Sequence, residues 1–370
     1  MKAMILAAGK GTRLQPLTHT IPKPMIPLLG KPVMEFLVEH LKAYGTRKIM
    51  VNTHHLADSI KNYFGNGKQF GVEIGYSFEG SLQDGEIVAQ PLGSAGGIKR
   101  IQDFCETGFF DDTFWVVCGD AVIDFDLTQV QRQHDRSNAV ASIVVAEVPK
   151  ERVSRYGVVI CDENYRITDF QEKPSAEEAK SNLVNTGVYV FEPEIIDLIP
   201  QAEEYDIGSQ LIPAMLKKCL PVNAISVPYS QWIDIGQISD YWEANQDLMR
   251  GRLKSVVMPG TEQEQGIYTG LNVNIASDQI EGPVYIGSGT SIEPGCEIYG
   301  PTWIGDGCHV QSGACISRSI LFDYSRLGPQ SRVKESLVFG RYCVDKDGNH
   351  VPDPEGNLDW VGDARDGSAS

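Results

Sequence analysis

The sequence predicts an α/β protein with a mixed, mainly parallel sheet, followed by a parallel β-helix. The first 250 residues or so alternate short β-branched runs with helical patterns, which favours parallel strands with helices on both faces. After about residue 255, aliphatic side chains recur every six residues, a period that belongs to neither a helix nor a flat strand. We therefore expect domains at 1–250 and 251–344, with a partly disordered tail at 345–370.

Composition excludes several classes of partner. The 370 residues carry 32 basic and 49 acidic side chains, and the net charge of −17 argues against nucleic acid or an anionic membrane. Apolar runs fall short of the roughly eighteen residues of a membrane span, and the N-terminus lacks the three-part pattern of a signal peptide. The eight cysteines show neither C-x-x-C nor zinc spacing, which favours reduced thiols in a cytoplasmic protein.

The first expected strand, Met4 to Ala8, ends in a loop with two glycines, an arginine and no acidic residue. Glycine lets backbone N–H groups approach and cradle an oxyanion. Arg13 and Lys23 add positive charge that can hold a triphosphate from two sides. The loop is not a Walker A loop, since Gly-Lys-Ser/Thr is missing, and the dinucleotide pattern G-x-G-x-x-G fails at Leu14. A glycine-rich turn with incidental charges is the alternative.

Further elements follow in order along the chain. Strands are expected at 47–52, 72–78, 113–118, 140–147 and 187–192, and helices at 32–44, 55–64, 94–104, 208–218 and 237–249. The stretch 156–174 resembles a hairpin with its turn at 162–164.

Two aspartates stand where a metal ion could bind. Asp120 follows the apolar strand at 113–118, so its carboxylate points into the crevice at the end of the sheet. Asp234 lies in the later segment 231–236, and the two could converge on one Mg²⁺ that also bridges a nucleotide phosphate. A helix-capping role is the alternative for Asp120.

Two more segments have the composition of binding loops. The glycine-rich stretch 90–97 could pack flat against a base, or Ser94 could cap the following helix. In Glu172-Lys173-Pro174, which closes the hairpin, lysine suits a phosphate and glutamate can accept hydrogen bonds from sugar hydroxyls. A solvated ion pair is the alternative for this turn.

The six-residue repeat predicts a β-helix with one coil for every three hexads and three to four coils in all. Cys296 and Cys308 then face the interior. Open edges at the ends of such a coil need covering, which favours a homo-oligomer. His309 permits a comparison with acyl-CoA-dependent transferases, although the coil is short for such a site. The inward aliphatic row, before its register slips, is Ile286, Ile292, Ile298, Ile304, Val310, Ile316 and Phe322.

The run L-A-A-G-x-G-T-R-L-x-P-L-T followed by P-K-P resembles the signature loop of the sugar-1-phosphate nucleotidyltransferases, or NDP-sugar pyrophosphorylases. The resemblance spans nearly the whole chain. It implies a Rossmann-like nucleotidyltransferase domain, a left-handed β-helix, Mg²⁺ as cofactor, and a nucleoside triphosphate and a sugar 1-phosphate as substrates.

The same resemblance implies roles for individual residues. Arg13, Lys23 and Lys173 would be catalytic, and Asp120 and Asp234 would hold the metal. Gly157, Glu172 and Asn185 would contact the sugar. The nucleotide contacts would be Leu6, Ala8, Gly9, Gly11, Thr12, Gln90, Leu92 and Gly93.

The exact substrates are a finer question. The stretch P-L-G-S-A-G-G resembles GDP-mannose pyrophosphorylases, whereas the overall layout resembles the non-classical bacterial UDP-glucose pyrophosphorylases. We favour UTP and glucose 1-phosphate, with GTP and mannose 1-phosphate second. A catalytically silent regulatory subunit is a hypothesis from another class. The presence of Arg13, Lys23, Asp120, Lys173 and Asp234 argues against it.

Overall fold

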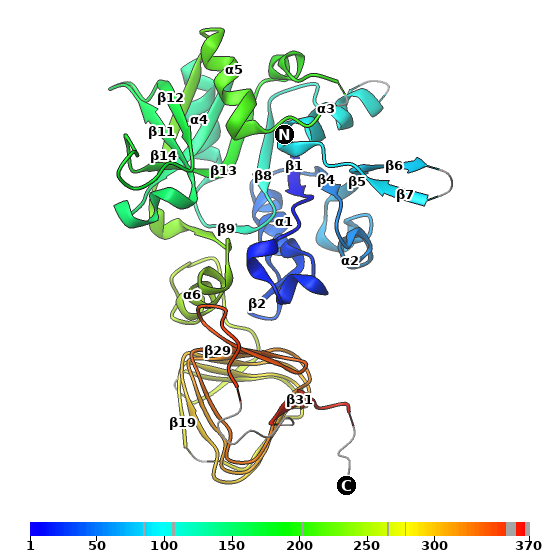
Figure 1. Ribbon diagram of the computed structural model, residues 1–370, viewed down its shortest axis with the longest axis vertical. Helices are drawn as coiled ribbons and strands as arrows, with labels where there is room; N and C mark the ends of the chain where they lie inside the picture. The colour runs from blue at the N-terminus through cyan, green and yellow to red at the C-terminus, as the bar shows by residue number, and fades with distance from the viewer. Residues whose placement is uncertain are drawn as a thin grey trace. The chain divides into compact units, whose positions relative to one another are not determined.

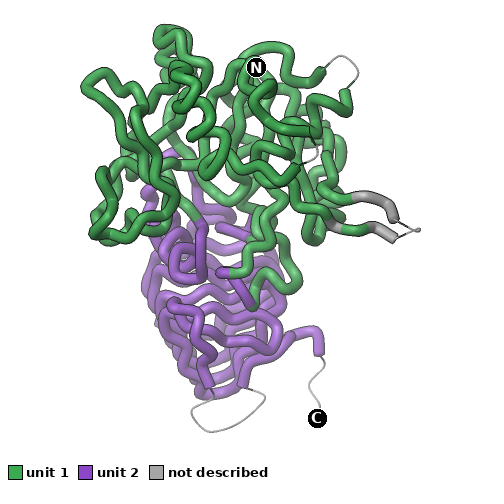
Figure 2. Tube along the Cα trace, turned by 45° about the horizontal axis from the view of Figure 1, so that its top comes forward, with its two compact units in different colours: residues 1–12, 16–26, 32–234 green, residues 13–15, 27–31, 235–370 purple. Residues whose placement is uncertain are grey.

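The computed structural model describes residues 1–83, 86–105, 108–201, 203–264, 266–277, 279–352 and 360–366. The chain forms two compact units (Figures 1 and 2). The first comprises Met1–Thr12, Pro16–Ile26 and Pro32–Asp234, and the second comprises Arg13–Gln15, Pro27–Lys31 and Ile235–Ser370. The division follows Asp234, so the helix at 238–249 belongs to the second unit. Two short pieces of the N-terminal loop also belong to that unit.

A nine-stranded mixed sheet forms the centre of the first unit (Figure 1). Its order is β12-β11-β13-β8-β1-β4-β5, with β10 beside β13 and β14 beside β10. Strands β8, β1, β4 and β5 are parallel, whereas β13 runs antiparallel to β8. All the strands predicted from the sequence are confirmed, as is the hairpin β11–β12. The strands are β1 (Lys2–Ala7), β4 (Lys48–Thr53), β5 (Glu73–Phe78), β8 (Phe114–Cys118), β10 (Ala141–Glu147), β11 (Gly157–Cys161), β12 (Ile167–Glu172), β13 (Leu183–Phe191) and β14 (Val222–Val227).

The predicted helices are confirmed to within about two residues at their starts. They are α1 (Val33–Ala43), α2 (Ala57–Phe64), α3 (Gly93–Phe104), α5 (Ile212–Lys217, after a π-helical turn Ile207–Leu211) and α6 (Ile238–Met249). Strand β14, helix α4 (Leu127–Ser137) and the hairpin β6–β7 (Gly80–Gln83, Glu86–Ala89) were not predicted. The Asp126 carboxylate caps α4 by accepting from Thr128 N and Gln129 N. In the parts of the chain described above, every helix is too short or too polar to cross a bilayer.

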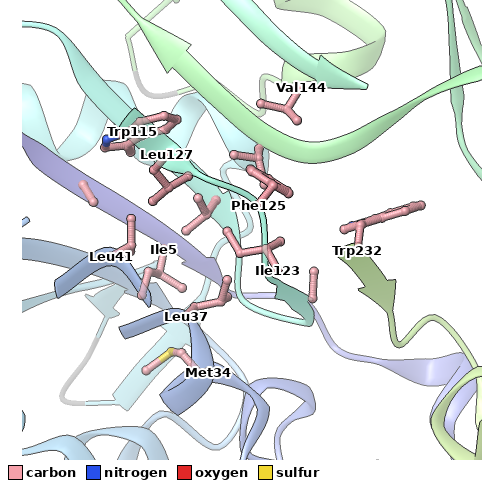
Figure 3. Close-up of a cluster of buried hydrophobic side chains, with 14 of the residues drawn as sticks. Ile5, Met34, Leu37, Leu41, Trp115, Ile123, Phe125, Leu127, Val144 and Trp232 are labelled. Carbon is pink, nitrogen blue, oxygen red and sulfur yellow. The ribbon is translucent and has the colours of Figure 1, made fainter. Parts of the chain in front are cut away.

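The strands of the first unit bury side chains on both faces of the sheet, which is typical of parallel strands covered by helices. On one face, Ile5 of β1 packs in a cluster with Leu37 and Leu41 of α1 and with Trp115 of β8 (Figure 3). The preceding residue, Met4, points the other way, into a second cluster with Ile98 of α3. This double packing fixes the ends of the central strands, and the predicted site lies at those ends.

The second unit contains a three-sided parallel β-helix, as the hexapeptide pattern predicts. Partners on neighbouring coils lie eighteen residues apart, as in the pairs Ile286–Ile304 and Ile298–Ile316. Its first face consists of β17 (Ile267–Thr269), β20 (Val284–Ile286), β23 (Thr302–Ile304), β26 (Ile320–Leu321) and β29 (Ser336–Phe339). The second consists of β18 (Asn274–Ile275), β21 (Ser291–Ile292), β24 (His309–Val310) and β27 (Ser325–Leu327). The third consists of β19 (Gln279–Glu281), β22 (Glu297–Tyr299), β25 (Cys315–Ser317) and β28 (Arg332–Lys334).

The inward row departs from the predicted register at Phe322. Ile304 pairs with Leu321, seventeen residues further on, so one residue is missing between Ile316 and the next inward position. Leu321 is fully buried and takes the inward place that the period of six assigned to Phe322. Cys296 and Cys308 are buried inside the coil, as predicted.

The chain covers several edges of its own β-helix. Strand β16 (Thr261–Glu264) pairs antiparallel with β17, and β30 (Tyr342–Asp345) pairs antiparallel with β29. Strand β31 (Val361–Asp363) pairs antiparallel with β27, and Trp360 joins the core beside it. These strands therefore have partners within their own chain, and the expected homo-oligomer stays a prediction.

The alternation in β25 gives a stability prediction. Ile316 is fully buried, whereas the adjacent Ser317 is partly exposed. Replacing Ile316 with Ala should lower the free energy of unfolding by about 2–5 kcal/mol, because it leaves a cavity in the coil. The matched change Ser317→Ala should cost less than about 0.5 kcal/mol. Denaturant unfolding measures both, and equal losses would contradict the inward assignment of Ile316.

Candidate active site

Leu6, Ala8 and Asp120, three of the residues predicted to bind substrate or metal, lie at one edge of the nine-stranded sheet. Leu6 pairs with Cys118 and Ala7 pairs with Thr53, so β1, β8 and β4 end side by side. Strand β13 runs the opposite way and brings its N-terminal half to this edge, where Val188 pairs with Val117. Ligands of open α/β sheets bind outside the carboxyl ends of parallel strands.

The loop after β1 contacts the turn after β8 through the backbone. Gly119 N donates to Leu6 O at 2.9 Å, and a Cβ at Gly119 would lie 2.9 Å from that same oxygen. Thr18 Oγ1 donates a hydrogen bond to Gly11 O at 2.8 Å, and Gly11 has a φ of +62°. Gly9 is exposed and faces open space, since a Cβ there would meet no atom within 4 Å. Ala8 is half-buried beside it, and Thr12 is exposed.

Lys23 and Asp120 form an ion pair between Nζ and Oδ2, although they stand 97 residues apart in the chain. Their side chains are 13% and 24% exposed. Lys23 opens a short 3-10 helix (Lys23–Met25) after Pro22. Because Asp126 caps the next helix, the capping alternative for Asp120 is wrong.

Asp234 lies on the strand next to Asp120. Strand β15 (Trp232–Asp234) pairs antiparallel with β9 (Ala121–Ile123), and Asp234 stands opposite Ala121. Burial raises the pKa of the Cys118 thiol, and the nearby Asp120 and Asp234 carboxylates raise that pKa further. The two aspartates predicted as metal ligands therefore converge on one place.

This pair of carboxylates suits Mg²⁺, which prefers one or two carboxylates together with phosphate and water oxygens. Within the described ranges, no group of three or more His, Cys, Asp or Glu side chains could hold a metal ion. Substrate phosphates and water could complete the coordination of an ion held by Asp120 and Asp234.

Arg13 lies in a 3-10 turn (Thr12–Leu14) that directly follows the glycine loop. Its side chain is exposed. Arg13 and Leu14 are grouped with the second compact unit, and Thr12 with the first. The role predicted for Arg13 stays a prediction.

The backbone of Tyr205 forms hydrogen bonds with the turn before α3 and with its first residues. Tyr205 N donates to Leu92 O at 2.8 Å, and Tyr205 O accepts from Ala95 N and Gly96 N at 2.9 Å each. Gly93 has a φ of +71°, and a Cβ there would lie 2.6 Å from Tyr205 O. Gln90 is exposed at the start of this stretch.

Ser94 does not cap α3, which corrects one of the two interpretations of its role. The residue before the helix is Leu92, and no side chain caps it. Ser94 Oγ instead donates to Asp206 Oδ2 at 2.7 Å and accepts from Ile207 N at 2.7 Å. Ser94 therefore links α3 to the segment that precedes α5.

The three predicted sugar contacts lie on neighbouring strands. Gly157 of β11 pairs with Glu172 of β12, and a Cβ at Gly157 would lie 2.4 Å from the Phe170 ring. On β13, Asn185 Oδ1 accepts from Gly187 N at 2.9 Å, and Asn185 Nδ2 donates to Tyr189 Oη at 2.7 Å. These bonds fix the Asn185 amide in one orientation.

Lys173 and Glu172 form an ion pair of 2.9 Å whose side chains are 55% and 39% exposed. An exposed pair of this kind contributes little to stability, so either side chain can turn toward a ligand at small cost. The Glu172 carboxylate also approaches Gly208, where a Cβ would lie 2.9 Å from Oε2. The predicted phosphate and sugar ligands are thus adjacent and accessible.

Sequence analysis missed several polar residues that hold this edge together. Asn52 and Glu79 are each 2% exposed, and both form side-chain hydrogen bonds beneath the loops. Asp206 and the backbone of Tyr205 hold α3, as described above. The one available signal was Asn52, an amide at the end of an otherwise apolar run. The other residues belong to no recognisable motif.

Comparison with known proteins gives a consistent result. The family model described as nucleotidyl transferase matches residues 2–251, and a model of bacterial transferase hexapeptide repeats matches residues 283–318. A UTP–glucose-1-phosphate uridylyltransferase of Synechocystis is 53% identical over 99% of this chain and 94% of its own length. A mannose-1-phosphate guanylyltransferase of Mycobacterium tuberculosis is 32% identical over 80% of this chain and 77% of its own. The crystal structure of HddC from Yersinia pseudotuberculosis superposes with a TM-score of 0.54 at 25% identity, covering 67% of this chain and 99% of its own.

Proposed function

The chain belongs to the nucleotidyl transferase family, and we propose that it makes UDP-glucose and pyrophosphate from UTP and glucose 1-phosphate. The 53% identity with the Synechocystis uridylyltransferase, over nearly the full length of both chains, supports this choice of substrates. The ion pair of Lys23 with Asp120, and the place of Asp234 on the strand that pairs with β9, support the chemistry. The guanylyltransferase relative, at 32% identity, makes GTP and mannose 1-phosphate the second candidate pair.

In the proposed reaction, a phosphate oxygen of glucose 1-phosphate attacks the α-phosphorus of UTP, and the bond to pyrophosphate breaks. The attacking oxygen is already anionic near neutral pH, so the reaction needs neither a protein nucleophile nor a general base. Burial and the nearby Asp120 and Asp234 carboxylates raise the pKa of the Cys118 thiol, which keeps it protonated. Catalysis then depends on positioning two anions and neutralising their charge.

Each predicted side chain has a part in that task. Lys23 and Arg13 would neutralise the triphosphate, and Lys173 would orient the attacking phosphate. Mg²⁺ bound by Asp120 and Asp234 would supply further charge neutralisation at the α-phosphate. The backbone at Leu6, Ala8, Gly9, Gly11 and Thr12, with Gln90, Leu92 and Gly93, would hold the nucleotide. Gly157, Glu172 and Asn185 would hold the sugar.

The alternatives have less support. A silent regulatory subunit would not need the ion pair of Lys23 with Asp120 beside Asp234. An acyl-CoA site in the β-helix has less support because the coil is short. His309 Nε2 lies 2.8 Å from Glu293 Oε1. All eight cysteines are free thiols, in keeping with a cytoplasmic protein. Assembly into a homo-oligomer stays a prediction.

The proposed function is tested by measuring pyrophosphate release. Five nucleoside triphosphates are each combined with glucose, mannose and N-acetylglucosamine 1-phosphates in the presence of Mg²⁺. We expect UTP with glucose 1-phosphate to give the highest kcat/KM. A higher value for GTP with mannose 1-phosphate would replace the proposed substrates, and no release from any pair would support the regulatory alternative.

Asp120→Ala should reduce kcat by about 100-fold or more, because it removes a charge that the transition state requires. The fold should persist, since Asp120 is partly exposed. Asp111→Ala is the matched control: this carboxylate forms an ion pair with Lys2 at the opposite end of the same parallel strands. Steady-state kinetics and circular dichroism measure the two effects. A near-wild-type kcat for Asp120→Ala would remove Asp120 from the site.

Lys173→Ala should raise the KM for glucose 1-phosphate by about tenfold or more, as expected for the loss of a charge-assisted contact. The KM for UTP should change little. Lys180→Ala provides the control, because Lys180 forms a comparable exposed ion pair with Asp169 near the same hairpin. A change confined to the KM for UTP would contradict the role proposed for Lys173.

A further inference from the structure

A buried chain of hydrogen bonds lies beneath the two segments that would hold the nucleotide. Ala7 N donates to Asn52 Oδ1 at 2.8 Å, and Asn52 Nδ2 donates to Glu79 Oε1 at 2.7 Å. Leu92 N donates to Glu79 Oε2 at 3.1 Å. The chain thus runs from the last residue of β1, across the ends of β4 and β5, to the turn before α3.

Each side-chain oxygen and nitrogen of Asn52 and Glu79 acts only as a donor or only as an acceptor in this series of hydrogen bonds. The Asn52 amide uses its oxygen toward β1 and its NH₂ toward Glu79, so a flipped amide would break both bonds. The Glu79 carboxylate receives two donors, one on each oxygen, which an amide of the same size cannot do. Burial raises the pKa of Glu79, whereas the donated bonds and the Arg100 guanidinium oppose that rise.

The side chains that form these hydrogen bonds are buried. Asn52 and Glu79 are each 2% exposed. A Cβ added at Gly97 of α3 would lie 3.1 Å from both Asn52 Nδ2 and Glu79 Oε1, so the helix packs directly against the pair. A buried carboxylate is costly unless it is fully hydrogen-bonded, and an apolar residue could fill the same volume. The polar chain therefore needs an explanation beyond packing.

The turn at Leu92 and Gly93 is also fixed on its other side. Tyr205 N donates a hydrogen bond to Leu92 O at 2.8 Å, and a Cβ at Gly93 would lie 2.6 Å from Tyr205 O. Leu92 is thus bound through its N–H to Glu79 and through its C=O to Tyr205. The turn cannot move toward or away from β1 without breaking one of these bonds.

We propose that Asn52 and Glu79 are positioning residues that set the separation between the loop after β1 and the Leu92–Gly93 turn, and thereby determine which size of nucleobase is accepted. This inference rests on the proposed function, in which these two segments hold UTP, and it places the base of UTP between them. A fixed separation suits one size of ring system, and a loosened one would admit the larger purine as well. Neither residue needs to touch the nucleotide.

Two single variants and their combination test the proposal. Glu79→Gln leaves one acceptor for two donors, and Asn52→Asp places a second acceptor against Glu79. Each change breaks one bond at nearly constant volume. The double variant reverses the polarity of the pair. The carboxylate introduced at position 52 would accept from Ala7 N and from the amide NH₂ introduced at position 79, and the oxygen of that amide would accept from Leu92 N. All three bonds can then form again.

The measured quantity is the ratio of kcat/KM for UTP to that for GTP, with glucose 1-phosphate as the second substrate. Each single variant should raise the KM for UTP and lower the ratio by about tenfold, the size expected for one lost hydrogen bond to a charged group. The KM for glucose 1-phosphate should stay within about twofold, and the double variant should recover most of the ratio.

Ser142→Ala serves as the structural control. Ser142 is fully buried on β10 and bonds to His134 at 2.8 Å, away from both segments, so its loss should lower the melting temperature without changing the ratio. If Glu79→Gln and Asn52→Asp behave like this control, the proposal is overturned. It is also overturned if the double variant remains as unselective as the single ones.

Failure of the proposed function would be seen separately, because the wild-type protein would then form no UDP-glucose. If one single variant is recovered unfolded, the other decides, since each breaks one bond of the same chain. In that case an unchanged ratio in the folded variant counts against the proposal.

Discussion

The ion pair between Lys23 and Asp120 is the contact on which the arrangement of the site depends. It joins the segment after the glycine loop to the turn after β8, and it places an ammonium group beside a carboxylate that has Asp234 on the adjacent strand. The molecule as a whole carries a charge of −17, so a polyanionic ligand can be held only where cations are concentrated locally. Lys23 is one cation at the sheet edge, where strand ends from distant parts of the chain lie side by side.

Much of this convergence could be predicted from the sequence. Asp120 follows a buried strand, and the carboxyl ends of parallel strands share an edge, so its position was inferable before its partners were known. Asn52 and Glu79 could not be found in the same way. They stand 27 residues apart, and a buried side-chain hydrogen bond leaves no periodic trace in a sequence. Helix α4 was missed because its sequence, LTQVQRQHDRS, has too few apolar residues to show a helical stripe.

Predictions from local sequence were also wrong where contacts with distant residues determined the structure. Serine favours helix caps, yet the Ser94 hydroxyl forms hydrogen bonds with Asp206 and Ile207, more than 110 residues away in the sequence. In the β-helix, the period of six was sufficient to predict the coil and the interior positions of Cys296 and Cys308. It could not reveal that one coil is a residue shorter, because Phe322 is as apolar as the Leu321 that replaces it inside.

The antiparallel strands at both ends of the β-helix have a consequence for how this architecture can vary. Each interior coil meets only its two neighbours, and the covering strands β16, β30 and β31 lie outside the repeating part. Whole coils of about eighteen residues could be gained or lost between those covers while every backbone edge they protect stays paired. The length of the coil is therefore open to evolutionary change by duplication, independently of the sheet that would carry out the chemistry.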